Sequence, residues 1–191
     1  MSLFDEHREK VREKIYEASI AAFQSKGYEN ASILEITKSV GVAKGTFYNF
    51  YLSKQEVLFV WAQNMFSGLN IGKAMKTEKT LEQNLEAFVD LTVEAIDASQ
   101  GLFRTFLSEL LKSQGEVNRS GQFDFIKIYE DIVNHSSDNN TVISQDFDTK
   151  VEMINSVLFM GIINWCNEHV QTKGLSDHLK KSMRLLLNGI L

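Results

Sequence analysis

No proline occurs in this chain of 191 residues. Proline lacks the amide hydrogen that a helix interior needs, and its ring clashes with the preceding turn, whereas loops and sheet proteins use it freely. Its absence from a chain of this length favours an all-α fold with short connections. The chain is long enough to bury a substantial core and to hold one or two domains.

Apolar residues recur at the spacing of one helix face along most of the sequence, which predicts about nine helices. The expected helices cover about residues 5–26, 33–40, 43–51, 54–70, 81–99, 101–113, 123–134, 148–172 and 176–191. Ser or Thr followed three positions later by Glu or Gln predicts a capping box before three of them, at Ser32, Ser53 and Thr80. Gly27 and Gly41 stand where helices should end, because glycine adopts the left-handed conformation of a carboxy-terminal cap.

Residues 32–58 read as two short helices joined by a tight glycine turn and followed at once by a third. The first helix places Ile33, Ile36 and Val40 on one buried face. The second begins at about residue 44 with a small polar first turn and directs aromatic residues to the opposite, packing side. Because a recognition helix offers its first turn to base edges in the major groove, we interpret this segment as a DNA-binding helix-turn-helix.

The order of residues in this segment is that of a known family. The run GVAKGTFY at residues 41–48, followed by Phe50, Tyr51 and SKQEVL at residues 53–58, resembles the amino-terminal domain of the TetR family of bacterial transcriptional regulators. The likeness continues upstream through residues 15–28, so it covers about the first third of the chain.

The resemblance implies a three-helix DNA-binding domain at residues 1–53 and an all-helical ligand-binding and dimerisation domain at residues 54–191. Charge divides at nearly the same place. The net charge is −5, yet residues 1–58, here called the head, hold eight cations and eight acids and are neutral. The acidic remainder should repel DNA and restrict contact to the head, where placed cations, hydroxyls and helix amino termini bind phosphates.

Side-chain chemistry and the resemblance together give the candidate DNA-binding residues. They are Ser32, Ala43, Lys44, Gly45, Thr46, Tyr48, Asn49, Tyr51 and Lys54. Lys44 can donate to guanine, Thr46 can touch a thymine methyl or a phosphate, and Gly45 lets the backbone approach closely. Asn49 either pairs with an adenine edge or is simply exposed to solvent.

The resemblance assigns phosphate contacts to Ser32 and Lys54. Their local alternatives are a helix cap for Ser32 and a solvated charge for Lys54. The chain departs from the commonest family pattern at Phe50, where many members carry Tyr or His, and Tyr51 either supplies the missing hydroxyl or lies in the core. Ala43 replaces a frequent serine, which removes one phosphate donor.

The last two expected helices are unusually apolar. Residues 157–166 are apolar nearly all round, and a helix without a wet face must be covered on both sides. The final helix carries an apolar stripe at Leu175, Leu179, Met183, Leu186 and Ile190. Either these helices are only the monomer core, or they form a four-helix bundle with a second subunit, and we favour a homodimer through residues 148–191.

Large aromatic and flexible side chains are frequent after residue 58, and they either pack the core or line an apolar cavity. The resemblance places an unknown small-molecule effector among these helices. The candidate ligand-binding residues are Trp61, Met65, Phe88, Phe103, Phe106, Glu109, Phe125, Tyr129, Asn155 and Phe159. The polar groups suited to orienting the effector are Glu109, Asn155 and Asn164.

No catalytic pattern appears in the sequence, which lacks a Gly-rich phosphate loop, a G-x-S-x-G elbow and a paired-His motif. We therefore expect neither an enzyme nor a cofactor. Cys166 and His169 lie three apart on one helix face, but two ligands are too few for a structural zinc site, so no metal is expected. A dimeric interaction module, or a redox or metal sensor built on these two residues, is the alternative function.

The expected location is the cytoplasm. The first ten residues are charged rather than an apolar run behind a basic start, so we expect no secretory signal. A single cysteine permits no internal disulfide, which suits a reducing compartment. The longest apolar stretch, residues 157–163, is far shorter than the ~20 residues that cross a bilayer, so we expect no membrane partner.

These observations predict a homodimeric, ligand-responsive transcriptional regulator. Two heads about 34–36 Å apart would match the two halves of a palindromic double-stranded DNA operator. The protein would act as a repressor that a small apolar effector releases from the operator.

Overall fold

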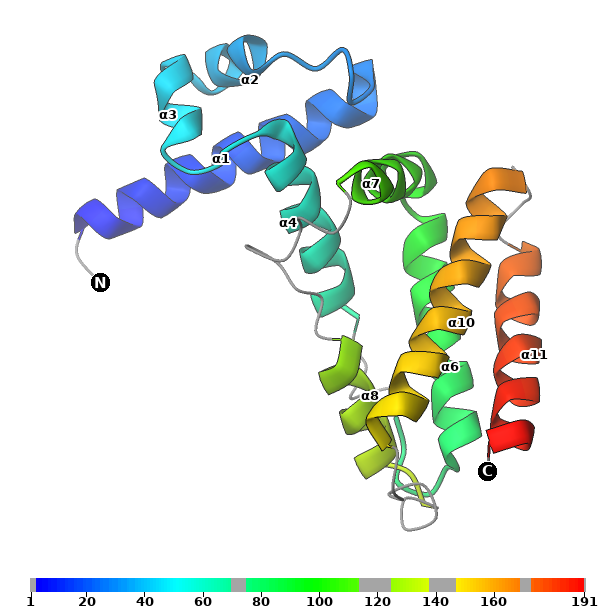
Figure 1. The fold of residues 1–191 in the computed structure, drawn as a ribbon. Helices are drawn as coiled ribbons and strands as arrows, with labels where there is room; N and C mark the ends of the chain where they lie inside the picture. Colours follow the sequence, from blue (N-terminus) through cyan, green and yellow to red (C-terminus); the bar gives the residue numbers. More distant parts are fainter. Residues whose placement is uncertain (1–2, 70–74, 114–124, 138–146, 169–172, 191) are drawn as a thin grey trace. The chain divides into compact units, whose positions relative to one another are not determined.

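The structure is a computed structural model that describes residues 3–69, 75–113, 125–137, 147–168 and 173–190. Within these ranges the backbone forms nine helices and no strand (Figure 1), which confirms the all-α prediction. The helices are α1 (Leu3–Lys26), α2 (Ile33–Val40), α3 (Lys44–Tyr48), α4 (Lys54–Ser67), α6 (Leu81–Asp97), α7 (Gln100–Lys112), α8 (Phe125–Asn134), α10 (Phe147–Glu168) and α11 (Lys173–Ile190). None of the helices described is long and apolar enough to span a bilayer.

Two glycines end helices of the amino-terminal region as expected. Gly27 follows α1 with φ +82°, and Gly41 follows α2 with φ +78°. The amides of Gly41 and Val42 donate to the carbonyls of Lys38 and Thr37, so the left-handed turn satisfies the last carbonyls of α2. Any residue with a Cβ at these two positions would be strained, because L side chains rarely adopt this backbone conformation.

The three expected capping boxes form to different degrees. At Thr80 both hydrogen bonds with Gln83 are present. At Ser53 the hydroxyl accepts from the amide of Glu56 at 3.2 Å, while the Glu56 carboxylate accepts from the amide of Leu52. At Ser32 the prediction is wrong: α2 begins where expected, but Ser32 makes no capping hydrogen bond.

The Glu35 carboxylate, the other expected member of this capping box, is engaged at the end of α1. Its Oε2 accepts from Lys26 Nζ at 2.9 Å. Both side chains are about half exposed, so this ion pair is weak.

The chain packs as two compact units. Unit 1 contains α1, α2, α3, α4 as far as Met65, and α7. Unit 2 begins at Phe66 and contains α6, α8, α10 and α11. Packing therefore groups α4 and α7 with the helix-turn-helix, and the expected functional boundary between residues 53 and 54 stays a prediction.

Unit 1 is built on apolar side chains of α1, α2, α3 and α4. Ile15, Phe47 and Leu58 are fully buried, and Ile36 is 2% exposed. Helix α2 packs against both α1 and α3. The core therefore fixes the orientation of α3 from the side opposite its polar first turn.

Helix α3 ends at Tyr48, three residues earlier than predicted. The chain then turns back, with the amides of Phe50 and Tyr51 both donating to the Phe47 carbonyl, at 3.0 and 2.9 Å. This turn carries Tyr51 into the core, where it is 3% exposed, and leaves Phe50 only half-buried. The aromatic residues expected on the packing side of this helix were Phe47 and Phe50, three positions apart, and that expectation is only partly confirmed.

Unit 2 packs α11 against both α10 and α6. Gly161 of α10 faces Leu179 of α11 so closely that a Cβ at Gly161 would overlap the Leu179 side chain. The stripe of α11 is buried at Leu175, Leu179 and Met183 as predicted, but it continues to Leu187 rather than Leu186. The error arises because packing follows an i, i+4 row along α11 instead of the 3.6-residue average.

Charged side chains join α11 to α6 in register. Lys180 Nζ lies 2.5 Å from Asp90 Oδ1, and the Ser176 hydroxyl donates to the same oxygen at 2.8 Å. One turn further along, Arg184 Nε donates to Glu86 Oε1 at 2.6 Å. We call these polar contacts between α6 and α11 the ladder. Together with the buried apolar side chains of α11, the ladder determines which face of α11 is directed away from unit 2.

A buried amide closes one end of unit 2. Asn84 is fully buried and exchanges hydrogen bonds of 3.2 Å with the amide and carbonyl of Lys76. Its Nδ2 also donates to the Ser136 hydroxyl at 3.1 Å, and the Ser137 amide donates to the Lys79 carbonyl at 2.9 Å. Asn84 thus ties the turn before α6 to the end of α8, which sequence patterns did not predict.

Candidate nucleic-acid interface

The first turn of α3 presents its polar surface to solvent. Lys44, Gly45, Tyr48 and Asn49 are exposed and Thr46 is half-buried. Phe47, between them, is fully buried and contacts the rings of Tyr48 and Tyr51 at centroid distances of 5.6 and 5.8 Å. One buried ring therefore anchors a short helix whose other side chains are available to a ligand.

The helix begins at an extended residue. Ala43 is the N-cap, with ψ 151°, and its carbonyl accepts from the Thr46 amide at 2.9 Å. Ser32, at the start of α2, is likewise exposed and its side chain is not used in capping. The cap alternative for Ser32 thus has no support in the structure, while its phosphate contact stays a prediction.

Lys54 is neither a solvated charge nor simply exposed. Its Nζ donates to the carbonyls of Tyr28, Glu29 and Ala31 at 2.8, 3.3 and 3.0 Å, and it lies 4.8 Å from the centroid of the Tyr28 ring. All three ammonium hydrogens are engaged by the loop between α1 and α2. A phosphate contact at Lys54 remains a prediction, and it requires the ammonium to leave at least one carbonyl.

Tyr51 lies in the core rather than on the surface. Burial raises the pKa of its hydroxyl, against the lowering effect of the nearby Arg12 guanidinium. Arg12 Cζ lies 6.0 Å from the centroid of the Tyr51 ring. This placement favours the core alternative for Tyr51, and its DNA contact stays a prediction.

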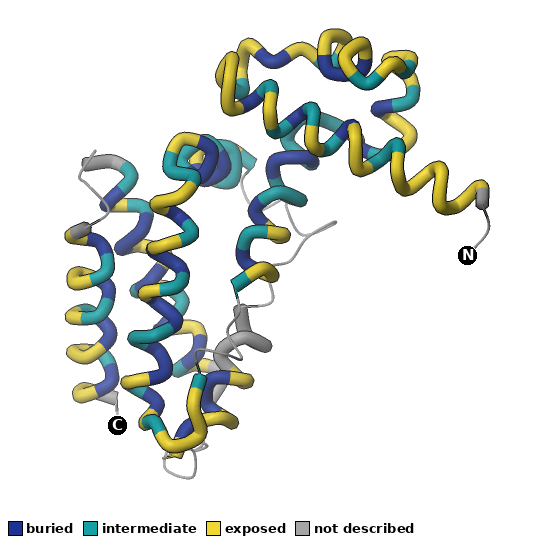
Figure 2. The backbone as a smooth tube through the Cα atoms, turned by 180° about the vertical axis from the view of Figure 1, so that it is seen from behind, coloured by how far each residue is buried: buried dark blue, intermediate teal, exposed yellow. Residues whose placement is uncertain are grey.

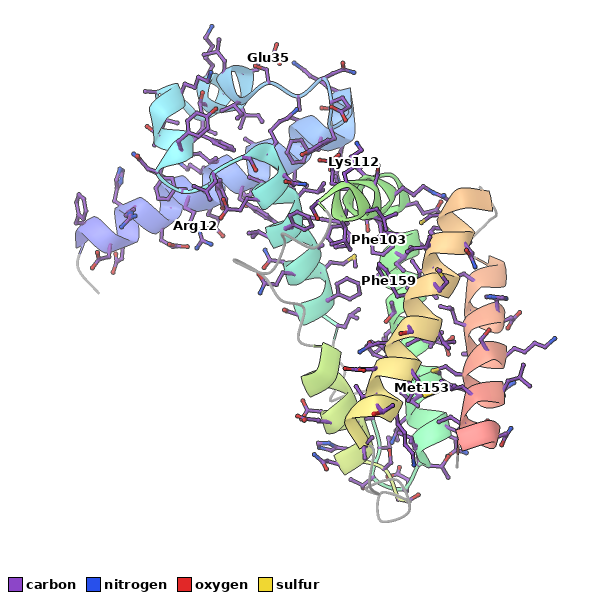
Figure 3. All side chains as sticks on the ribbon, in the orientation of Figure 1. Arg12, Glu35, Phe103, Lys112, Met153 and Phe159 are labelled. Atoms are coloured by element: carbon purple, nitrogen blue, oxygen red, sulfur yellow. The ribbon has the colours of Figure 1, made fainter. Side chains whose placement is uncertain are left out.

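Two arginines of α1, which the sequence analysis did not select, lie beside the end of the recognition helix. Arg8 Cζ is 5.7 Å from the centroid of the Phe50 ring. Arg12, labelled in Figure 3, donates to Glu9 Oε1 at 2.7 Å, and this hydrogen bond raises the Arg12 pKa. Only their i, i+4 spacing on one helix face signalled a common role.

Between the first turns of α1 and the end of α3 lies an open cleft of about 500 Å³. It is lined by Asp5, Arg8, Glu9, Arg12, Asn49 and Phe50. The first turns of α1 are exposed along their length, as Figure 2 shows. A candidate base-reading residue, Asn49, therefore shares a cleft with two guanidinium groups.

Helix α7 contacts the loop after α1 through a second polar cluster. The Tyr28 hydroxyl donates to Glu109 Oε2 at 3.4 Å, and Lys112 Nζ lies 2.8 Å from Glu109 Oε1. Burial, and next the negative charge of Glu109, raises the pKa of Tyr28, so its hydroxyl stays protonated. The Glu109 carboxylate is thus already bonded within the protein, which weakens its case as a group that orients an effector.

The candidate ligand-binding residues divide between the two units. In unit 1, Phe103 and Phe106 are buried, Trp61, Met65 and Glu109 are half-buried, and Phe106 contacts Phe59 and Phe103 at centroid distances of 5.5 and 5.9 Å. In unit 2, Phe88 is buried, Asn155 half-buried and Phe159 41% exposed, while Asn164 is exposed. Phe125 and Tyr129 lie on α8, but their side chains fall outside the part of the chain that is described.

Unit 2 exposes large apolar side chains on its last two helices. Met153, Phe159 and Met160 of α10 are 42%, 41% and 56% exposed, and Leu185 of α11 is 68% exposed. Figure 3 labels Met153 and Phe159 along α10. Side chains of this kind favour burial against another surface.

The alternative site at Cys166 gains no support. Cys166 is half-buried on α10, and His169 lies outside the described residues. Among the residues whose positions are described, no group of three or more His, Cys, Asp and Glu side chains is arranged to hold a metal ion.

Comparison with known proteins identifies the segment that carries this interface. Residues 15–60, which run from the middle of α1 into α4, match the sequence model of the bacterial regulatory proteins of the tetR family. This amino-terminal segment is thus similar to the DNA-binding domain of TetR-family regulators. The all-α fold and the exposed first turn of α3 agree with the helix-turn-helix that this match covers.

Three proteins illustrate the relationship. The transcriptional repressor DhaR of Mycobacterium sp. (strain GP1) is 30% identical over 108 residues, which are 56% of this chain and 48% of DhaR. FadR of Thermus thermophilus, a TetR-family repressor crystallised with lauroyl-CoA, has a TM-score of 0.79 at 23% identity, over 94% of this chain and 95% of that one. FadR of Bacillus subtilis, crystallised with stearoyl-CoA, has a TM-score of 0.58 at 18% identity, over 93% and 98%.

These comparisons differ in what they cover. The chain spans about half or less of the length of the curated relatives it matches. The two FadR structures cover nearly the whole chain, but at their level of identity the likeness shows a shared fold.

Proposed function

We propose that this TetR-family chain is a homodimeric, ligand-responsive transcriptional regulator that represses its target by binding a palindromic operator. The observation that carries the proposal is the exposed first turn of α3. Lys44 in this turn is exposed, as are Tyr48 at the end of the helix and Asn49 at its C-cap, while Phe47 anchors the helix in the core. Such side chains form hydrogen bonds with base edges in the major groove.

A homodimer is proposed because unit 2 exposes apolar side chains on both of its last helices. The ladder from α6 holds one face of α11, so Leu185 is directed away from α6. Pairing this surface with its copy across a two-fold axis would bury Met153, Met160 and Leu185 together. Two heads in one molecule would then read two half-sites of a palindrome.

The proposed effector is a small molecule with a large apolar part. Aromatic residues of α4 and α7 supply the apolar surface, and the two FadR proteins of the same fold were crystallised with acyl-CoA thioesters. Acyl-CoA compounds of graded chain length are therefore the first compounds to test. An apolar pocket binds through buried area, and a few polar groups fix the orientation of the ligand.

Release from DNA would follow if effector binding tilts α4 and changes the separation of the two heads. The coupling required is modest, since ~1–3 kcal/mol changes operator affinity ~5- to 150-fold. Because coupling is reciprocal, the operator must weaken effector binding by the same factor. Titration of lauroyl-CoA with and without operator tests this, and equal dissociation constants in the two titrations would exclude lauroyl-CoA as the inducer.

The DNA-binding claim is tested by substitution of the reading surface. A variant with Lys44, Thr46 and Tyr48 all changed to Ala should lose preference for genomic fragments selected by the wild type, since each base contact is worth ~1–3 kcal/mol. Circular dichroism should show unchanged helix content, because none of the three side chains is buried. Equal operator binding by this folded variant and the wild type would refute the proposed reading surface.

A further inference from the structure

The head has few cations that remain available for DNA. Of its eight Lys and Arg residues, Arg12 and Lys26 are paired with Glu9 and Glu35, and Lys54 is engaged by three carbonyls. No ion pair within the described ranges involves the remaining five, which are Arg8, Lys10, Lys14, Lys38 and Lys44. In a head with no net charge, the attraction to phosphate must come largely from whichever of these five cations face the DNA.

Two of these cations flank the recognition helix. Lys44 is its first residue, and Arg8 lies over Phe50, two residues beyond its end. The other three lie on α1 or α2 and do not line the cleft. Arg8 is therefore the available cation placed at the carboxy-terminal end of α3.

The Arg8 guanidinium lies over the Phe50 ring, with Cζ 5.7 Å from the ring centroid. Phe50 has no polar atom, so this cation–π contact uses none of the hydrogen-bond donors of Arg8. A guanidinium with donors to spare, in the same cleft as the exposed Asn49, is suited to a bidentate contact with a phosphate.

We propose that Arg8 is a DNA-backbone contact, and that a phosphate of the operator occupies the cleft formed with Asn49 and Phe50. The inference rests on the proposed function and adds to it a contact from outside the helix-turn-helix. Glu9 does not oppose the phosphate, since its charge is balanced by Arg12 at 2.7 Å. Asp5, which also lines the cleft, does oppose it, and this gives the proposal a second test.

The first test removes the Arg8 charge. Wild type, Arg8→Gln and the matched control Lys14→Gln are titrated against a genomic fragment selected by the wild type and against a random duplex of equal length. Arg8→Gln should weaken binding to both duplexes ~10-fold or more, and should reduce the salt slope by about 1.8, which is ~0.9 for each of two heads. Lys14→Gln removes the same charge from an exposed position of α1 outside the cleft and should have a much smaller effect.

The second test removes the opposing acid. Asp5→Asn should strengthen binding to both duplexes, whereas Glu13→Gln, with the same charge change outside the cleft, should strengthen it much less. Arg8→Lys keeps the charge but loses the planar guanidinium, and Phe50→Leu removes the aromatic ring that contacts Arg8. The DNA affinity of both variants should therefore lie between that of the wild type and that of Arg8→Gln. Thermal unfolding of each variant separates loss of contact from loss of fold.

Each result has a defined consequence. In one outcome the wild type binds its operator while each variant has the same DNA affinity as its control, that is, Arg8→Gln as Lys14→Gln and Asp5→Asn as Glu13→Gln. In that case the phosphate contact is refuted and the proposed function stands. If Arg8→Gln weakens only the operator, Arg8 reads bases and the backbone contact is refuted. If the wild type binds no duplex, the proposed function fails and this contact fails with it.

Discussion

At the scale of single residues, the roles of charged groups depend on neighbours that are distant in sequence. Lys54 illustrates this, because the three carbonyls that hold its ammonium belong to residues 28–31. The sequence motif identifies Lys54, but it does not predict that the carbonyls of the loop between α1 and α2 accept hydrogen bonds from its ammonium. Glu35 is a similar case, since Lys26 draws it away from the capping role that its position predicts.

Lys54→Ala should destabilise unit 1. The substitution leaves three carbonyls without their donor, which should lower the free energy of unfolding by about 1–3 kcal/mol. Chemical denaturation measures the change, with Lys38→Ala, an exposed lysine of α2, as control. Equal stability of the two variants would contradict the structural role, and a reduced salt slope for Lys54→Ala would mean that the ammonium transfers to phosphate on binding.

Asn84→Ala should destabilise unit 2. Asn84 is fully buried and makes three hydrogen bonds, so truncation leaves the Lys76 amide without its acceptor. It also removes one hydrogen bond from the Lys76 carbonyl, which keeps the Lys79 amide, and one from the Ser136 hydroxyl, which keeps the Ile132 carbonyl. The expected loss is roughly 1–3 kcal/mol. The control is Asn155→Ala, at a half-buried position of the same unit. A denaturation midpoint for Asn84→Ala as high as that of the control would argue against a stabilising role of the Asn84 hydrogen bonds.

At the scale of helices, local signals were predictable and packing was not. The capping box at Thr80 and the glycine turn at Gly41 depend on residues within four positions, and both are confirmed. Two packing outcomes depend instead on the helix or turn that a residue contacts across the core. Leu187 is buried instead of Leu186, and Tyr51 is buried more deeply than Phe50. Periodicity gives the width of an apolar face, but not which of two adjacent residues fills it.

Gly161→Ala should destabilise the pair of helices α10 and α11. The new methyl group would overlap the Leu179 side chain, and overpacking of this kind costs about 1–3 kcal/mol. Gly189→Ala is the matched control, because its Cβ would meet no atom within 4 Å. A denaturation midpoint for Gly161→Ala equal to or above that of Gly189→Ala would contradict the close approach at Gly161.

Asp90 gives the ladder between α6 and α11 a dependence on pH. Burial acts to raise its pKa, but hydrogen bonds from Lys180 and Ser176 and the Lys180 charge outweigh burial, so the pKa is lowered. A carboxylate with a depressed pKa stabilises the fold above its unfolded pKa of about 4, and the contribution disappears as pH falls through the lower folded value. The stability difference between wild type and Asp90→Asn should therefore shrink below about pH 4, and a difference that stays constant down to about pH 3 would contradict this role of Asp90.

At the scale of the whole molecule, the proposed function needs two copies of the chain. The apolar character of residues 157–166 predicted a covered helix, and the structure leaves Phe159 and Met160 of that helix exposed. The proposed second subunit would account for this difference by covering these two side chains. How two subunits pair is set by long-range packing, which is why the sequence predicts the helices involved but not the residues in contact.

Charged substitutions on the exposed apolar side chains should disrupt the dimer. Met160→Glu and Leu185→Glu place a carboxylate where the proposed interface is dry, so they should yield monomers or aggregates and abolish operator binding at ordinary concentrations. Leu111→Glu is the control, because Leu111 is 55% exposed on α7, a helix of unit 1. Light scattering decides, and a wild-type mass of one 21.8 kDa subunit at micromolar concentration would defeat the proposal.

The central claim is that two copies of α3 read a palindromic operator. Footprinting of the wild-type protein on a selected genomic fragment tests it most directly, because protection records both the sequence bound and the spacing of the heads. We predict two protected half-sites related by inverted symmetry, with centres about one helical turn apart or a multiple of it. Protection that follows no sequence, or a single unrepeated site, would contradict the account.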